Sequence, residues 1–312
     1  MKKELSILIP VYNYDCTELA QGLCREMSEL AADGVRIELV VADDGSTSTE
    51  TLDANALLST LPRCRYIRRS QNVGRAVIRN VLARESQYQW LLFLDCDMQL
   101  PGNQFLHNYL CSDGQEVVDG GFGVVENASL KGRNLRYSYE WSELQRHSVE
   151  QRRANPYRSF RTTNFMIRRD IMLAHPFDER FVRYGYEDVL FGKELKQHGI
   201  TITHIDNAML LTDLEANDVF VAKTEEAIGT LHQFRSDLRG YSRLLTTAEG
   251  IHIAPVRWCI RLWHWLFGWL ERRILCSKHP SLKVFKLYKL GYFLSLNNKQ
   301  TKSFGTDYTD KH

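Results

Sequence analysis

Short apolar runs alternate with helical stretches along the first hundred residues, and each run stops at polar residues. The runs cover residues 5–11, 36–42 and 90–94, and the polar segments 12–13, 43–46 and 95–97 follow them. Such runs are typical of strands buried on both faces of a parallel sheet, and strands that alternate with helices indicate βαβ units. The pattern predicts an α/β fold whose strand ends share one edge of the sheet.

The third run ends abruptly on two carboxylates, Asp95 and Asp97. Asp is disfavoured in strands and costly to bury without a partner, so these side chains are expected to meet water, a cation or a ligand. In open α/β sheets, ligands bind at the carboxyl ends of the strands. An Asp-x-Asp pair there can hold a hard divalent cation, which can bridge a diphosphate. A solvated strand end explains the pair equally well, so the pair needs support from other motifs.

Six motifs resemble, in order and spacing, those of family 2 glycosyltransferases with the GT-A fold. They are segments 9–13, 41–46, 72–80, 95–97, 177–181 and 184–188, and the resemblance runs from about residue 5 to about 230. It implies a Rossmann-like, mostly parallel sheet flanked by helices. We expect a catalytic domain over residues 1–235, with a nucleotide-binding half (1–100) and an acceptor half (101–235), and a helical extension over 236–312.

The resemblance also implies where the donor and a cation bind. Pro10, Tyr12 and Asp43 match residues that hold the uracil and ribose of a UDP-linked sugar, and Arg79 matches a basic residue near the nucleotide. The full set of expected donor-binding residues is Pro10, Tyr12, Asp43, Asp44, Asn72, Arg79 and Asp95. Asp97 matches the direct ligand of Mn²⁺ or Mg²⁺, with Asp95 beside it. Such a cation stabilises the charge that develops on a diphosphate leaving group.

One position departs from the family pattern. Members often carry a second metal ligand, a His, after the catalytic helix, and Leu211 stands there instead. His204 comes too early, and its apolar neighbours indicate a strand histidine. Asp213 could supply an oxygen ligand, which hard cations accept. The departure leaves open a non-catalytic GT-A-like subunit that binds a donor or a partner enzyme, although such a subunit would be expected to lose Asp97 or Asp188, and both are present.

Glu187 and Asp188 open a predicted helix over residues 187–197, with Gly199 suited to its C-terminal cap. Helix capping alone would explain them, because acids in a first turn contribute about 0.3–1 kcal/mol. The resemblance implies that Asp188 is the general base that deprotonates an acceptor hydroxyl, and that Glu187 orients the acceptor. A base opposite the leaving group implies inversion at the anomeric carbon. A nucleotidyltransferase is a weaker hypothesis than a glycosyltransferase, because the acidic start of this helix favours glycosyl transfer.

Two loops are expected to complete the site. The glycine-rich segment 120–123 would lie near the donor sugar, because glycine permits close backbone approach, although ordinary turns explain these glycines as well. Segment 161–164 would lie near the acceptor. We expect Thr163, Asn164 and Tyr186 to contact the acceptor.

Composition agrees with a cytoplasmic enzyme. The 312 residues are 44% hydrophobic, enough for a full α/β core, and the seven cysteines show no C-x-x-C spacing, as expected in a reducing compartment. The resemblance implies a hexosyl- or N-acetylhexosaminyltransferase that modifies a glycan or lipid-linked acceptor in surface polysaccharide or glycolipid synthesis. A possible homo-oligomer is left open.

Charge is concentrated at the C-terminal end. Residues 1–254 carry a net charge of −6 and residues 255–312 a net charge of +8, with no motif for nucleic-acid binding. Arg257, Arg261, His264, Gly268 and Glu271 form a polar stripe on a predicted helix over 256–275, and Trp258, Leu262, Trp265 and Trp269 form an apolar one. Charges interrupt the segment too often for a membrane span. We expect an interfacial helix that docks on the anionic inner face of the cytoplasmic membrane; packing on the catalytic domain or a second copy is the alternative.

Overall fold

The computed structural model describes residues 1–296, which form two compact units. The first unit contains Met1–Val125, Glu143–Val182 and Glu187–Asp213. The second contains Glu126–Ser142, Arg183–Tyr186 and the chain from Leu214 onward. This division differs from the domain boundary expected after residue 235, because the helix before that point groups with the C-terminal helices.

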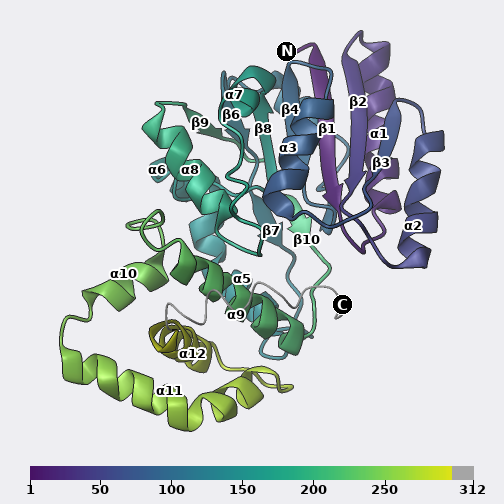
Figure 1. Ribbon diagram of the computed structural model, residues 1–312. Helices are drawn as coiled ribbons and strands as arrows, with labels where there is room; N and C mark the ends of the chain where they lie inside the picture. Colours follow the sequence, from purple (N-terminus) through teal and green to yellow (C-terminus); the bar gives the residue numbers. More distant parts are fainter. Residues whose placement is uncertain (297–312) are drawn as a thin grey trace. The chain divides into compact units, whose positions relative to one another are not determined.

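The first unit is built on a seven-stranded sheet in the order β3-β2-β1-β4-β8-β6-β9 (Figure 1). The strands are β1 (Glu4–Val11), β2 (Arg36–Asp43), β3 (Cys64–Arg68), β4 (Trp90–Leu94), β6 (Val117–Asp119), β8 (Asn164–Arg168) and β9 (Ile202–His204). Only β8 runs antiparallel to its neighbours. The expected mostly parallel α/β sheet is therefore confirmed.

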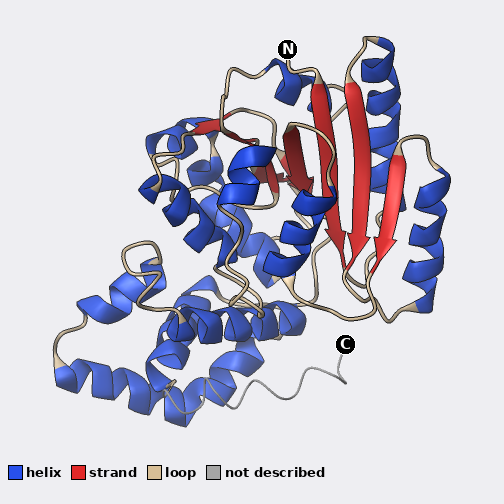
Figure 2. Ribbon diagram, turned by 45° about the horizontal axis from the view of Figure 1, so that its top comes forward, coloured by secondary structure: helices blue, strands red, loops and turns tan. Residues whose placement is uncertain are grey.

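The apolar runs of the sequence form the central strands because both faces of the sheet are covered. Every residue of β4 is buried, and in β2 only Arg36 is exposed. Helices flank the sheet (Figure 2). They are α1 (Thr17–Ala32), α2 (Thr49–Ala56), η1 (Leu57–Thr60), α3 (Arg75–Glu85), α4 (Phe105–Cys111), η2 (Leu144–His147), α6 (Val149–Ala154), α7 (Arg169–Ala174) and α8 (Glu187–Gln197).

A small second sheet connects the end of β4 to a distant part of the chain. Its strands are β5 (Met98–Gln99), β10 (Met209–Leu211) and β7 (Phe122–Val124), in the order β5-β10-β7. β10 runs antiparallel to β5, with Leu211 opposite Met98. Since Leu211 is the last paired residue of β10, the chain leaves this sheet next to Met98, which follows the Asp-x-Asp segment.

The second unit is helical. It contains α5 (Leu135–Glu143, whose last residue belongs to the first unit), α9 (Asn217–Gln233), α10 (Arg243–Gly250), α11 (Ala254–Leu275) and α12 (Leu282–Ser295). Buried Leu135, Val221, Leu275, Phe285 and Tyr288 form one apolar cluster of this unit. The helical C-terminal extension is thus confirmed. Across residues 1–296, no helix has both the length and the apolarity that crossing a bilayer requires.

Candidate functional site

The loops after β1 and β2 form one wall of the site. The register pairs Val11 with Asp43 at the carboxyl ends of the two strands. Asp43 is fully buried and accepts hydrogen bonds from the Ser46 amide (2.7 Å) and the Tyr66 hydroxyl (3.0 Å). Tyr12 is 42% exposed and Pro10 is half-buried. Of the expected base- and ribose-binding residues, Tyr12 therefore presents the most open surface.

Asp44 forms hydrogen bonds with the loop that precedes α3. Its two carboxylate oxygens accept the amides of Val73 and Gly74, each at 3.0 Å, and Asn72 also accepts the Gly74 amide at 3.1 Å. Burial raises the pKa of Asp44 to about 6, against the effect of these two amides. Asp44 and Asn72 thus hold the loop that leads into α3.

Arg79 of α3 connects the donor side to the start of α8. Its side chain is 1% exposed. One terminal nitrogen lies 2.8 Å from Asp95 Oδ1 and the other lies 3.4 Å from Glu187 Oε1. Arg79, expected near the donor nucleotide, is thus a buried bridge between two expected site residues, Asp95 and Glu187.

The neighbouring Asn80 anchors the segment that precedes α8. Its side-chain nitrogen donates to the Phe177 carbonyl at 2.9 Å, and its side-chain oxygen accepts the Phe177 amide at 2.9 Å. The same nitrogen donates to Glu179 at 3.0 Å. Two motifs about a hundred residues apart in sequence are thus joined by a pair of hydrogen bonds to one backbone position.

Asp188 lies in the first turn of α8, which spans Glu187–Gln197 as predicted. Its side chain is half-buried and accepts the Val189 amide at 2.7 Å. Burial and the adjacent Glu187 charge raise the pKa of Asp188 to about 6, although Arg161 and Arg79 act in the opposite direction. Such a carboxylate is more basic than an ordinary Asp and is still ionised at neutral pH, which suits a general base. Glu187 itself is buried against Arg79.

Asp97 and Asp213 both act on Tyr14, Asp213 through a hydrogen bond and Asp97 through its charge. Burial, the charge of Asp213 and a hydrogen bond to it raise the pKa of the Tyr14 hydroxyl, and Asp97 adds to this effect. Leu211 is buried in β10, and its side chain has no donor atom for a metal. Among residues 1–296, no three His, Cys, Asp or Glu side chains gather as a metal site would need. Two carboxylates still fit a cation that takes its other ligands from substrate phosphates, as Mg²⁺ commonly does.

The three residues expected to contact the acceptor, Thr163, Asn164 and Tyr186, have different surroundings. The Thr163 carbonyl accepts the Asp95 amide at 3.0 Å, so Thr163 adjoins the site. Asn164 is 1% exposed, and its side chain bonds the Tyr109 hydroxyl (2.6 Å) and the carbonyls of Gly121 and Asn207 (each 2.8 Å). The polar atoms of the Asn164 side chain are thus engaged in hydrogen bonds inside the protein. Tyr186 belongs to the second unit and adopts a left-handed conformation, with φ 70°.

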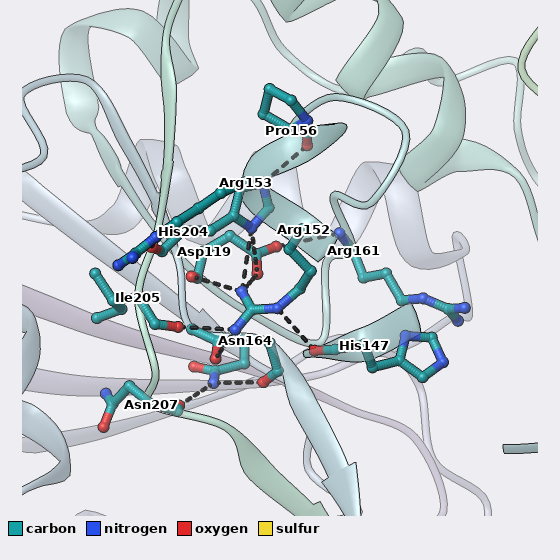
Figure 3. Close-up of polar contacts among 12 residues, drawn as sticks. Asp119, His147, Arg152, Arg153, Pro156, Arg161, Asn164, His204, Ile205 and Asn207 are labelled. Atoms are coloured by element: carbon teal, nitrogen blue, oxygen red, sulfur yellow. Dashed lines mark hydrogen bonds and ion pairs between the residues drawn. The ribbon is translucent and has the colours of Figure 1, made fainter. Parts of the chain in front are cut away.

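A buried polar network beside β6 was not foreseen from the sequence (Figure 3). Arg152 lies 2.8 Å from Asp119 Oδ1 and donates to the carbonyls of Gly120 (3.2 Å) and Ile205 (2.8 Å). Arg152 also lies 3.1 Å from His204 Nδ1, and His204 Nε2 lies 2.9 Å from the Pro156 carbonyl. His204 ends strand β9, so the strand histidine is confirmed.

This network also explains the glycine loop. Gly121 has φ 77°, and a Cβ there would lie 2.6 Å from the Arg152 guanidinium carbon. A Cβ on Gly120 would lie 2.4 Å from the Tyr109 hydroxyl. Both glycines are therefore required by internal packing. The sequence signal for the network was weak, because a buried Arg–Asp pair separated by 33 residues has no local pattern.

Comparisons with known proteins agree with the geometry. The sequence profile of a family described as Glycosyl transferase family 2 matches residues 6–174. A hyaluronan synthase from Pasteurella multocida is 28% identical over 205 residues, which cover 55% of this chain and 21% of that protein. An uncharacterized glycosyltransferase from Haemophilus influenzae is 34% identical over 93 residues, 30% of this chain and 36% of that protein. The chain thus matches only about a third or less of the length of these relatives.

Solved structures share the fold. S. aureus TarS aligns with a TM-score of 0.51 at 17% identity, over 99% of this chain and 93% of that one. The mannosyltransferase PcManGT from Pyrobaculum calidifontis, solved with GDP-Man and Mn²⁺, aligns with a TM-score of 0.53 at 12% identity, over 94% of this chain and 86% of that one. TarS has also been solved with UDP-GlcNAc. The GT-A arrangement expected from the sequence is therefore confirmed.

Proposed function

Since the chain belongs to glycosyl transferase family 2, we propose that it transfers a sugar from a nucleotide donor to an acceptor hydroxyl with inversion at the anomeric carbon. The observation that carries this proposal is the buried link from Asp95 through Arg79 to Glu187 (2.8 and 3.4 Å). It fixes the start of α8, and with it Asp188, relative to the strand end where donors bind in open α/β sheets.

The donor is proposed to be UDP-linked, with a hexose or N-acetylhexosamine as the sugar. Tyr12 offers an exposed ring beside the ends of β1 and β2, and a ring of this kind can stack on a base. Asp95, half-buried at the end of β4, is suited to the ribose. A nucleotide-sugar donor is also consistent with the complexes of TarS with UDP-GlcNAc and of PcManGT with GDP-Man.

Asp97 and Asp213 are the residues proposed to hold a divalent cation, Mn²⁺ or Mg²⁺. When bound, such a cation stabilises negative charge on a leaving diphosphate. Asp95 orients the same strand end, since its amide donates to Thr163 and its carboxylate bonds Arg79. Tyr14 holds Asp213 through its hydroxyl. PcManGT, which shares the fold, was solved with Mn²⁺.

Asp188 is proposed to accept the proton of the acceptor hydroxyl. Its raised pKa follows from burial and from Glu187, and it makes the carboxylate a better base than a solvated Asp. The carboxylate of Glu187 is paired with Arg79. Glu187 is therefore proposed to hold the start of α8 in place and to raise the pKa of Asp188. The acceptor is proposed to be a glycan or a lipid-linked saccharide of surface polysaccharide or glycolipid synthesis, which would place the enzyme at the inner face of the cytoplasmic membrane.

A non-catalytic donor-binding subunit is the second candidate. The observation that favours catalysis over it is the coexistence of Asp97, Asp213 and a basic Asp188 in one unit. The deciding experiment is release of UDP from a panel of UDP-sugars with Mn²⁺, comparing wild type with Asp188→Asn. Turnover that the substitution removes, with UDP affinity retained, supports the enzyme. UDP binding without turnover of any donor or acceptor tested would support the binding subunit instead.

A further inference from the structure

Helix α11 turns its apolar face outward. Gly268, Glu271 and Leu275 are its buried residues, so the second half of the polar stripe lies on the packed side, whereas Arg257 and Arg261 at its start are exposed. The side chains of Trp258, Trp265 and Trp269 are 63%, 77% and 65% exposed. Residues 7 and 11 positions apart lie within about 20° of each other on a helix, so these three indoles form one outward ridge. A surface helix of a globular protein ordinarily has the opposite arrangement.

Specific contacts hold His264 and Glu271, in the second half of the polar stripe, inward. Glu271 accepts the Trp263 indole N–H at 2.9 Å and lies 3.3 Å from His264 Nδ1. His264 packs against Tyr288 of α12, with ring centroids 5.2 Å apart. Gly291 of α12 leaves room for it, since a Cβ there would lie 2.8 Å from His264 Cβ. The outward direction of the tryptophan ridge is therefore fixed by complementary packing between α11 and α12.

Further apolar side chains widen the ridge, and basic residues border it. Leu266 and Leu270 are 44% and 40% exposed. Arg257, Arg261 and Arg273 are exposed on the same helix. Residues 255–296 contain eight Lys and Arg and a single acid, the buried Glu271. Lys289, which lies 4.3 Å from the Phe285 ring centroid, belongs to the internal packing of the unit.

We propose that this ridge, defined as Trp258, Trp265, Trp269, Leu266 and Leu270, inserts into the headgroup region of a bilayer that contains anionic lipid. Tryptophan is enriched at membrane–water interfaces, and bordering arginines match a negatively charged surface. The basic charge around the ridge distinguishes this partner from an apolar protein surface. The proposal concerns a surface of the second unit and does not depend on glycosyl transfer.

The test is binding of the full-length protein to phosphatidylcholine vesicles with and without phosphatidylglycerol, without donor or acceptor. We expect sedimentation with the anionic vesicles, a shift of tryptophan emission to shorter wavelength, and weakening as salt rises. Trp258→Ala/Trp265→Ala/Trp269→Ala should reduce binding on the order of 100-fold or more. Replacing the same residues with Phe should retain much of it.

Two further variants test the contribution of charge and the specificity for the ridge. Arg257→Gln/Arg261→Gln/Arg273→Gln should weaken binding by about 100-fold, because each basic residue near such a surface contributes about fivefold. Leu57→Ala/Val182→Ala removes equally exposed apolar side chains outside α11 and should leave binding unchanged. Equal binding of wild type and the Trp→Ala variant overturns the proposal. The proposal is also overturned if the wild type binds no vesicles and forms a dimer that the Trp→Ala variant converts to a monomer. The ridge would then join two copies of the chain.

Discussion

Asp188→Asn should lower the turnover of the protein and raise its stability at the same time. Burial and Glu187 raise the pKa of Asp188 from 3.8 to about 6, so the folded state binds this proton more tightly than the unfolded state. The stabilising effect of the proton is complete below the ordinary pKa and is lost as pH rises through about 6. Above that pH, the charged side chain destabilises the fold.

The size of the effect follows from the pKa values. The difference between 3.8 and about 6 corresponds to ~3 kcal/mol at most. Asn keeps the shape and one oxygen that can accept the Val189 amide, but its NH₂ group replaces the second carboxylate oxygen, so we expect a net gain of about 1–2 kcal/mol at pH 8. In a unit of this size, that gain raises the melting temperature by roughly 2–8 °C.

The assay is thermal unfolding of wild type and Asp188→Asn at pH 8 and near pH 4, together with turnover. The gain should be present at pH 8 and nearly absent at pH 4, where the wild-type carboxyl is protonated. Turnover should fall by about 10²–10⁴-fold. Asp170→Asn is the matched control, because Arg168 lowers the pKa of Asp170, and it should show no gain at pH 8. A variant of Asp188 that is less stable than wild type at pH 8 would refute the reasoning.

Three other substitutions test the site. Arg79→Met should lower the free energy of unfolding by about 3–5 kcal/mol in chemical denaturation, because it leaves Asp95 and Glu187 without their buried cation; an unchanged midpoint would contradict the bridge. Asp97→Ala should abolish the dependence of UDP affinity on Mn²⁺ in calorimetry, and equal wild-type affinity in EDTA and Mn²⁺ would sink the cation proposal. Gly121→Ala should destabilise the protein by roughly 1–3 kcal/mol through its φ of 77° and the Arg152 contact; a neutral result would show that Arg152 moves aside.

The local elements could be predicted because their signals lie in neighbouring residues. The apolar run 90–94 is strand β4, and the expected helix 187–197 is α8, followed by Gly199 with φ 69°. The helix expected over 256–275 is α11, Ala254–Leu275. Each of these segments combines a clear period or apolar run with a matching turn residue.

What could not be predicted depends on partners distant in sequence. The spacing within loop 161–164 does not say which residue faces inward, and the structure turns Asn164 toward Tyr109. The stripes on α11 were visible in the sequence, but their direction depends on α12, whose Gly291 admits His264. Arg79 matched a family position, yet its pairing with Glu187, 108 residues away, arises only from the tertiary fold.

The Arg79 bridge has a consequence for how the two substrates are handled. A buried ion pair is weak evidence for stability, because desolvation offsets much of the attraction, so its value is better sought in geometry. Arg79 holds Asp95, which adjoins the expected ribose and cation, and Glu187, which precedes the expected base. If Asp95 moves when a donor binds, the rigid guanidinium of Arg79 would pass this movement to Glu187 in the first turn of α8. Donor binding and placement of Asp188 would then be coupled, so that the base is in position when the donor is present.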